Sequence, residues 1–305
     1  MKIDYIKRNC PICGSKSSKE EIYSKSRAEK TEFSLLKEIW NGFFKEKIIF
    51  TYSRCNKCKT LYCPTFFSNK HLEELYGQMP ANMDQVPLSA LKKTQKGYFD
   101  FLKKHSDLSG NFLEVGPDIG LFTENCVKEG DYQNYWLLEP NISVKNELKS
   151  VVSGKESSII HEMFDFSKIP DNSISTVVII HVMDHLIDPL EYLESMKKKL
   201  KKDAKILIVT HDEKSILRKI FKIKWPPFCL QHPQLFNLKT TENFLNRLNY
   251  EIIAQDKTKN YFKISFLLKH LLWGFGLKIN SVPNFFGITV GLKLGNIITV
   301  AKYNG

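Results

Sequence analysis

The stretch FLEVGPDIGLFT, residues 112–123, decides the fold. It opens with the apolar run FLEV, typical of a buried strand, and two glycines, Gly116 and Gly120, follow before a helical segment. Glycine lets the backbone bend tightly and approach a ligand, and the first turn of a helix leaves N–H groups free to bind it. The stretch therefore predicts a strand, a ligand-binding turn and a helix.

An acidic residue closes the next apolar run, YWLLE at 135–139, and this residue, Glu139, lies 23 residues after Gly116. A carboxylate at that distance from a glycine turn is placed to accept both hydroxyls of a ribose. The sequence contains neither the dinucleotide pattern G-x-G-x-x-G nor the triphosphate loop G-x-x-x-x-G-K-[ST], which argues against a bound pyrophosphate and against triphosphate hydrolysis. Glu114, just before the first glycine, suits a ligand that carries an amino group.

Strand-like and helix-like segments alternate after this turn, and the alternation predicts a parallel sheet with helices on both faces. The segment TTENFLNRLN, 240–249, indicates a helix with Thr240 or Thr241 as its N-cap. The expected strands are 112–115, 135–139, 158–164, 176–182, 204–210, 250–255 and 296–303, and the other expected helices are 91–105, 123–130, 143–152 and 189–202.

The composition is that of a globular protein, because 42% of the 305 residues are hydrophobic and 26% are charged, which excludes a disordered chain. The start MKIDYIKRNC lacks the apolar segment of a secretory signal, and the apolar runs are much shorter than the ~20 residues that cross a bilayer. We therefore expect a cytoplasmic location. The excess of 45 basic over 33 acidic residues, a net charge of +12, indicates anionic partners without naming one.

Shifts in composition divide the chain into an N-terminal domain at 1–78, a linker at 79–90 and a main domain at 91–305. Two insertions are expected inside the main domain, at about 213–239 and 258–294. The second insertion mixes lysine with phenylalanine, leucine and tryptophan at helical spacing. Such a segment fits a lid over a site or part of a core, and it also fits a contact with a membrane surface.

Four of the seven cysteines form two C-x-x-C pairs, in CPICG at 10–14 and CNKC at 55–58. Each pair places two sulfurs on one tight turn, as a tetrahedral zinc ion requires. Cys63 is an alternative fourth ligand, whereas Cys126 and Cys229 fit buried small hydrophobic residues. We expect a structural zinc site in a zinc ribbon, with the ligands Cys10, Cys13, Cys55 and Cys58.

The spacing E-V-G-x-x-x-G at 114–120, with an acid closing the next strand, resembles the class I S-adenosylmethionine-dependent methyltransferases. The segment 180–212 is similar to that family's fourth strand, its E-H-x-x-D-P turn, a helix and the fifth strand, with Asp184 in place of the glutamate and His185 in register. The resemblance covers about 90–305. It implies an α/β fold with a Rossmann-like seven-stranded sheet, whose last strand lies antiparallel beside the fifth and sixth.

The resemblance also implies how individual residues bind the cofactor S-adenosylmethionine. Glu114 would face the methionine amino group, and Glu139 would hold the ribose hydroxyls. Phe164 and Asp165, after the third strand, would flank the adenine, and His181, closing the fourth strand, would lie beside the sulfonium. The expected cofactor-binding residues are Glu114, Gly116, Asp118, Gly120, Glu139, Phe164, Asp165 and His181.

The segment RCNKCKTLYCPTFFSNKHLEELYG, 54–77, resembles the zinc-ribbon start of bacterial methyltransferases that modify sugars and surface glycans, with Pro64, Ser68 and Tyr76 in corresponding positions. This resemblance implies methyl transfer to a hydroxyl or, as the weaker alternative, to a carbon. The acceptor would be a sugar, a glycan precursor or a related small metabolite.

A hydroxyl acceptor must lose its proton as the methyl group arrives, and histidine is the usual base near neutral pH. Ligands bind at the carboxyl edge of such a sheet, and four histidines follow the fourth and fifth strands: His181, His185, His211 and His232. We select His181 and His232 for the chemistry. His185 and Asp184 are further candidate catalytic residues, which we expect chiefly to brace the turn after the fourth strand.

Two other functions stay open at this point. The net charge of +12 and the zinc ribbon also fit an RNA methyltransferase. A base-amine methyltransferase, however, has the motif N-P-P-[YF] after its fourth strand, where this chain has HVMDHL. An enzyme that methylates a pyrimidine carbon needs a cysteine near the substrate, and Cys229 is the one cysteine available. Asp118 replaces a common glycine of the turn, and Ser175 replaces the acid that usually opens the fourth strand. These two departures allow a non-catalytic binding protein on a decayed methyltransferase fold.

Overall fold

The computed structural model describes residues 5–40, 47–77, 87–274, 277 and 288–305. Its centre is a seven-stranded sheet in the order β12-β15-β10-β9-β6-β7-β8. The first five strands along the chain pair in parallel, and β15 is antiparallel to both of its neighbours, β10 and β12. This confirms the expected α/β sheet. Its strands are β6 (Ser109–Val115), β7 (Asp131–Leu138), β8 (Glu156–Ile160), β9 (Ile174–Ile180), β10 (Leu200–His211), β12 (Tyr250–Lys257) and β15 (Asn296–Tyr303).

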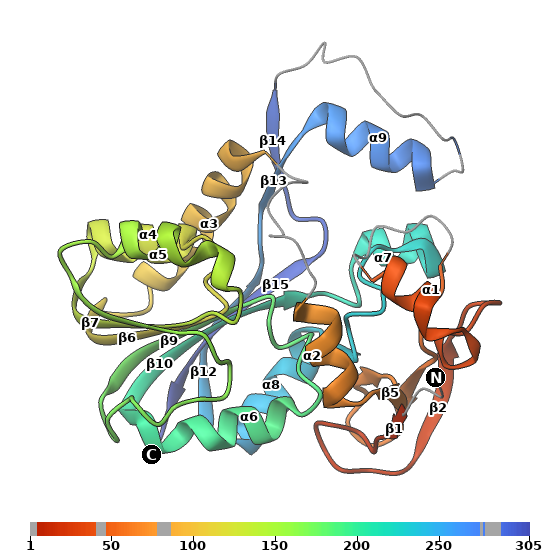
Figure 1. Ribbon diagram of the computed structural model, residues 1–305, viewed down its shortest axis with the longest axis horizontal. Coiled ribbons are helices and arrows are strands. Elements are labelled where there is room, and N and C mark those ends of the chain that lie inside the picture. The colour runs from red at the N-terminus through yellow and green to blue at the C-terminus, as the bar shows by residue number, and fades with distance from the viewer. Residues whose placement is uncertain (1–4, 41–46, 78–86, 275–276, 278–287) are drawn as a thin grey trace.

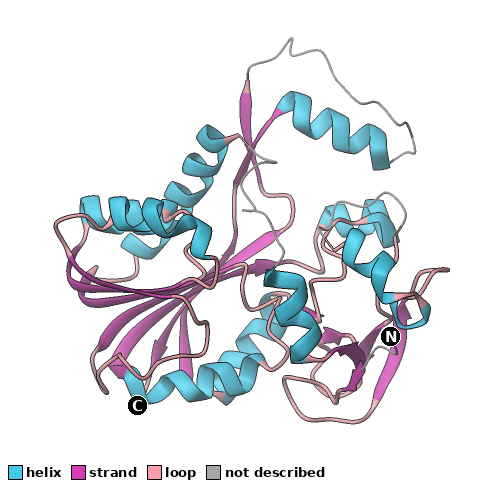
Figure 2. Ribbon diagram, viewed as in Figure 1, coloured by secondary structure: helices cyan, strands magenta, loops and turns pink. Residues whose placement is uncertain are grey.

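Helices cover both faces of this sheet, as Figures 1 and 2 show. Neighbouring residues of the central strand β9 enter different cores, since Val177 packs on one face and Val178 on the other. This alternation follows from the strand period of two, and burial on both faces explains why the strands are continuous apolar runs. One face carries α3 (Leu88–Lys103), α4 (Leu121–Glu129) and α5 (Lys145–Val151), and the other carries α6 (Pro189–Met196) and α8 (Leu238–Arg247).

Several element ends differ from those expected. Helix α8 begins after Asn237, whose side chain accepts hydrogen bonds from the Lys239 and Thr240 N–H groups in a capping box. Neither Thr240 nor Thr241 is the N-cap, so that expectation is wrong. Strand β8 ends at Ile160, four residues before the expected end. Helix α3 starts at Leu88, inside the expected linker, and linker residues 79–86 lie outside the described residues.

The N-terminal region is not a separate unit, because the expected insertion at 213–239 completes it. Strand β11 (Gln234–Leu235) from this insertion pairs with β4 in a four-stranded sheet of order β11-β4-β3-β2. Trp225 and Phe228 of the same insertion pack in one core with Trp40, Phe50 and Phe66. The region contains β1 (Tyr5–Lys7), β2 (Ser18–Ile22), α1 (Phe33–Glu38), β3 (Tyr52–Cys55), β4 (Leu61–Tyr62), β5 (Thr65–Phe67), α2 (Asn69–Gly77) and α7 (Ile216–Phe221).

The expected insertion at 258–294 forms a hairpin of β13 (Asn260–Lys263) and β14 (Thr289–Leu292), which carries α9 (Ile264–Gly274) away from the central sheet (Figure 1). Residues 275–276 and 278–287 of this insertion lie outside the described residues. Within the part of the chain that the structure describes, no helix has both the length and the apolar character needed to span a membrane. Single 3₁₀ turns lie at Ala28–Lys30, Ile142–Val144, Lys197–Lys199 and Lys222–Lys224.

Candidate active site

The glycine turn between β6 and α4 has the geometry that the sequence predicts. Gly116 and Gly120 both adopt positive φ, at 69° and 76°. A Cβ atom on Gly116 would lie 2.6 Å from Cγ2 of Val182, and one on Gly120 would lie 3.0 Å from Cδ2 of Leu148. Both positions therefore require glycine. Asp118 also has positive φ, 51°, which for a residue with a side chain costs roughly 1 kcal/mol.

Glu139 follows β7 and lies against this turn. One carboxylate oxygen accepts the Asp118 N–H at 2.9 Å, and the other accepts the Asn141 N–H at 2.8 Å. Its side chain is buried, and burial raises its pKa against the opposing effect of these two donors. These hydrogen bonds join Glu139 to the middle of the turn, and its expected contact with a ribose stays a prediction. His161 is not among the residues selected from the sequence. Its Nδ1 atom lies 2.9 Å from the backbone carbonyl oxygen of Glu139.

Glu114 lies at the end of β6 and is completely enclosed. Its carboxyl accepts a hydrogen bond from the Thr123 hydroxyl on α4. Burial raises the pKa of Glu114 to about 8, with the Glu139 charge acting in the same direction. Burial and Glu139 likewise raise the pKa of Asp118 to about 6. At neutral pH Glu114 is therefore a protonated acid, held by Thr123.

Phe164 and Asp165 lie on the loop after β8. The Phe164 side chain is exposed and meets the Tyr192 ring edge to face, with centroids 5.0 Å apart. The Asp165 carboxylate accepts the Ser167 N–H at 2.9 Å and so caps its own turn. Nothing in these contacts tests their expected place beside an adenine, which stays a prediction.

The four candidate histidines converge on one cluster at the carboxyl edge of the sheet. His181 directly follows β9, His211 ends β10, and His185 and His232 come from loops. Ring centroids are 4.7 Å apart for His181 and His211, 4.9 Å for His211 and His232, and 4.6 Å for His185 and His232. The residue after His181 is Val182, whose side chain leaves no room for a Cβ atom on Gly116. The cluster and the glycine turn are therefore neighbours.

Asp184 does more than brace the turn after β9. Its completely buried carboxylate accepts the backbone N–H of His211 at 3.0 Å and lies 2.9 Å from His211 Nδ1. Although burial opposes ionisation, His211 holds the pKa of Asp184 below its usual value. The sequence placed His211 near the site but left it out of the chosen catalytic residues. The pairing with Asp184 makes it a central residue of the cluster.

The histidines differ in charge. Burial and His211 lower the pKa of His181 to about 3, and its Nε2 lies 3.1 Å from Nδ2 of Asn296. Burial also holds the pKa of His185 well below normal, and its Nδ1 lies 2.9 Å from the Tyr76 hydroxyl. These two rings are neutral at pH 7.

His232 is the exception in this cluster. Burial opposes its protonation, but the Cys229 sulfur, 3.4 Å from Nδ1, outweighs it and raises the pKa to about 9. Its Nδ1–H donates to the Pro227 carbonyl at 2.7 Å. A histidine that already carries its proton is poorly suited to accept another. Of the two histidines selected for the chemistry, His181 is the neutral one.

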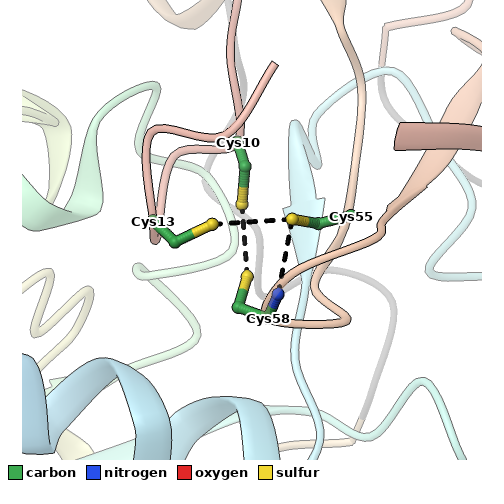
Figure 3. Close-up of side chains that lie close together, drawn as sticks. All are labelled: Cys10, Cys13, Cys55 and Cys58. Atoms are coloured by element: carbon green, nitrogen blue, oxygen red, sulfur yellow. Dashed lines mark hydrogen bonds between the residues drawn. The ribbon is translucent and has the colours of Figure 1, made fainter. Parts of the chain in front are cut away.

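The two cysteine turns meet in a second cluster, shown in Figure 3, where all four side chains point toward one centre. The Sγ atoms of Cys10 and Cys58 are 3.4 Å apart, those of Cys13 and Cys55 are 3.5 Å apart, and all four lie within 4.8 Å of one another. Zinc–sulfur bonds of about 2.3 Å place tetrahedral sulfurs about 3.8 Å apart. The donor set and its spacing therefore fit a zinc ion.

Cys63 does not belong to this cluster. It is completely buried, and its sulfur lies 3.9 Å from the His232 carbonyl oxygen. Cys126 and Cys229 are buried as expected. Gly14 and Lys59, which follow the two cysteine pairs, have matching φ values of 69° and 64°. The second turn therefore adopts the left-handed conformation of the first without a glycine.

The family model of a methyltransferase domain matches residues 90–255, more than half of the chain. The chain belongs to this methyltransferase family. This confirms the expected class of enzyme. No curated protein sequence matches the chain.

Solved structures share the fold. A putative S-adenosylmethionine-dependent methyltransferase from Listeria monocytogenes has a TM-score of 0.50 at 9% identity, covering 69% of this chain and 99% of the other. A putative methyltransferase from Haloferax volcanii, solved in complex with the Trm112 methyltransferase activator, has a TM-score of 0.52 at 11% identity, covering 71% and 92%. The fold of this chain is thus similar to that of both methyltransferases.

Proposed function

We propose that this methyltransferase takes its methyl group from S-adenosylmethionine and transfers it to a hydroxyl of a sugar, a glycan precursor or a related small metabolite in the cytoplasm. The observation that carries the proposal is the histidine cluster with Asp184, beside the glycine turn at the carboxyl edge of the sheet. In the reaction an acceptor oxygen forms a bond to the methyl carbon as the sulfur–carbon bond breaks. The hydroxyl proton must leave, and the cluster is where it is removed.

The cofactor would lie along the glycine turn. In this arrangement Glu139 binds the ribose hydroxyls, and the backbone of Gly116, Asp118 and Gly120 lies under the methionyl part. Glu114 faces the methionine amino group, whose positive charge would lower the raised pKa of Glu114 and favour the ionised carboxylate. Phe164 and Asp165 flank the adenine, and His181 lies beside the sulfonium.

A hydroxyl acceptor is supported by the neutral rings of His181 and His185, since a neutral imidazole has a lone pair to offer. A sugar or glycan precursor is supported by the resemblance of residues 54–77 to glycan-modifying enzymes. The segment WPPF at 225–228 looks similar to the N-P-P-[YF] motif of base-amine methyltransferases. Its aromatic rings are not available to stack on a nucleic-acid base, because Trp225 and Phe228 are completely buried in the N-terminal core. If the acceptor is linked to a lipid, helix α9 would contact the surface of the membrane.

We further propose that Cys10, Cys13, Cys55 and Cys58 hold one structural zinc ion. The fit of their sulfurs to a tetrahedron supports this assignment. The ion would fix the two turns that lead into β2 and β4, and through the sheet that β11 completes it would stabilise the loop that carries His232.

The test is methyl transfer from S-adenosylmethionine with a labelled methyl group to a panel of nucleotide sugars, free glycans and RNA. We expect the label in a methyl ether of a sugar, which survives mild base, whereas a methyl ester does not. Label in RNA alone would reject the acceptor class. Failure to bind S-adenosylhomocysteine in titration calorimetry would reject the cofactor.

A further inference from the structure

The histidine cluster contains a set of ligand atoms that its role as a hydroxyl-binding site leaves unexplained. We propose that His181, Asp184 and His211 bind a divalent transition-metal ion, which coordinates the acceptor hydroxyl. The part of this inference that concerns the acceptor rests on the proposed function. The metal site itself does not, because it follows from the positions of three side chains.

The spacing of these side chains suits one ion. One ligand atom from each of the three residues lies within 4.8 Å of the other two. Asp184 Oδ2 and His211 Nδ1 are 2.9 Å apart, and two neighbouring ligands about 2.1 Å from an octahedral ion are about 3.0 Å apart. The carboxylate–imidazole pair therefore already has the separation of two adjacent metal ligands.

Two buried atoms of this set lack hydrogen-bond partners among the described residues. They are Oδ1 of Asp184, a side chain with 0% exposure, and Nδ1 of His181. Buried polar atoms in proteins are almost always satisfied. Seven other buried side-chain atoms of the described residues also lack partners, but in this group two such atoms belong to residues whose ligand atoms lie within 4.8 Å of one another, which supports a partner outside the chain.

The surrounding residues hold these ligands in place. The His211 N–H fixes the Asp184 carboxylate at 3.0 Å. Asn296 is opposite His211 in the register of β10 and β15, and its amide contacts His181 Nε2. Rotation of that amide by 180° presents its oxygen to Nε2–H and leaves Nδ1 of His181 free to bind an ion. Metal-binding histidines commonly donate their second N–H in this way.

The ligand types select the class of ion. Two imidazole nitrogens and one carboxylate suit Mn²⁺, Fe²⁺, Co²⁺ or Zn²⁺ better than Mg²⁺ or Ca²⁺. Three protein ligands leave positions for acceptor oxygens, and the His211 side chain is 22% exposed, so the site is open to solvent. Coordination makes a bound hydroxyl more acidic. Its proton leaves to water, the oxygen–carbon bond forms, the sulfur–carbon bond breaks, and the ion keeps its oxidation state.

Mn²⁺ is the probe for this site, because it favours nitrogen and oxygen ligands over the thiolates of the cysteine cluster. The protein is given one Zn²⁺ per chain, which the four thiolates bind in preference, and is then titrated with Mn²⁺, whose free ion is followed by its electron paramagnetic resonance signal. We expect one bound Mn²⁺ per chain. Asp184→Asn and His211→Gln should each weaken this binding at least tenfold, whereas His105→Gln, on the loop after α3, should leave it unchanged.

Binding of S-adenosylhomocysteine by each variant shows that it is folded. Absence of Mn²⁺ binding by the parent protein, or equal binding by a folded Asp184→Asn or His211→Gln variant, would overturn the metal site. If the parent binds no Mn²⁺ and yet methylates a hydroxyl, the metal proposal fails and the proposed function stands. If Mn²⁺ binds as expected and no hydroxyl is methylated, the proposed function fails and the metal site stands.

Discussion

The buried carboxyl of Glu114 should make the stability of the protein fall as the pH rises. Its pKa is about 8 in the folded protein against 4.5 for an ordinary glutamate. Between these values the folded state binds one more proton than the unfolded state. The free energy of unfolding therefore decreases by roughly 1.4 kcal/mol per pH unit. The stability that the protonated form contributes is fully present below pH 4.5 and is lost as the pH rises toward 8.

The substitution Glu114→Gln isolates this effect, because glutamine is neutral at every pH and its amide oxygen still accepts the Thr123 hydroxyl. Between pH 4.5 and pH 7, Glu114 lowers the free energy of unfolding of the parent protein by about 3 kcal/mol, which corresponds to roughly 6–10 °C in melting temperature. The measurement is thermal unfolding of both proteins without cofactor at pH 5, 6, 7 and 8. The melting temperature of the variant should rise relative to that of the parent across this series.

The matched control is Glu147→Gln, at an exposed position on α5. The difference in melting temperature between this variant and the parent protein should be the same at every pH. A flat difference for Glu114→Gln as well would refute the argument, since it would mean that Glu114 ionises at its ordinary pKa in the folded state. Proton release on binding S-adenosylhomocysteine, measured by calorimetry in two buffers, would then be absent too.

Four further variants test the cysteine cluster, the ribose site and the histidines. Purified protein should contain about one zinc per chain, and Cys10→Ser with Cys55→Ser should remove it; full retention by the double variant would contradict the four-cysteine site. Glu139→Ala should weaken S-adenosylhomocysteine binding about tenfold or more in calorimetry, because a charge-assisted hydrogen bond contributes ~1.5–3 kcal/mol; equal affinity would exclude the ribose role. His181→Ala should lower the methyl-transfer rate by ~10²-fold with cofactor affinity within a few-fold. His232→Ala should lower that rate less, because His232 is already protonated, and the reverse order would show that the charge assignment is wrong.

The central sheet could be predicted from sequence because its signals are local. Runs such as Val177–Ile180 are apolar at every position, as strands buried on both faces require, and glycine and proline mark the turns between them. The convergence of four histidines was also predictable, because side chains that follow parallel strands meet at one edge. Asn237 was missed as an N-cap because two threonines farther along the same helix offered an equally good local signal.

The pairing of Asp184 with His211 and the place of residues 213–239 could not be predicted from local patterns. Asp184 lies 27 residues from His211, and the hydrogen bond between them exists only once β9 and β10 are aligned. Strand β11 has two residues, and its partner β4 lies more than 170 positions away in the chain. Nothing in the composition of so short a strand indicates which sheet it joins.

The place of β11 in the N-terminal sheet has a consequence for synthesis on the ribosome. The first segment of the N-terminal region ends with α2 at Gly77, but the sheet and aromatic core of this region are completed by residues up to Leu235. A ribosome adding 5–20 residues per second needs roughly 8–30 s to make the intervening chain. During that interval Trp40, Phe50 and Phe66 lack their final cover. The nascent chain therefore presents a hydrophobic surface that chaperones recognise, although the finished protein buries it.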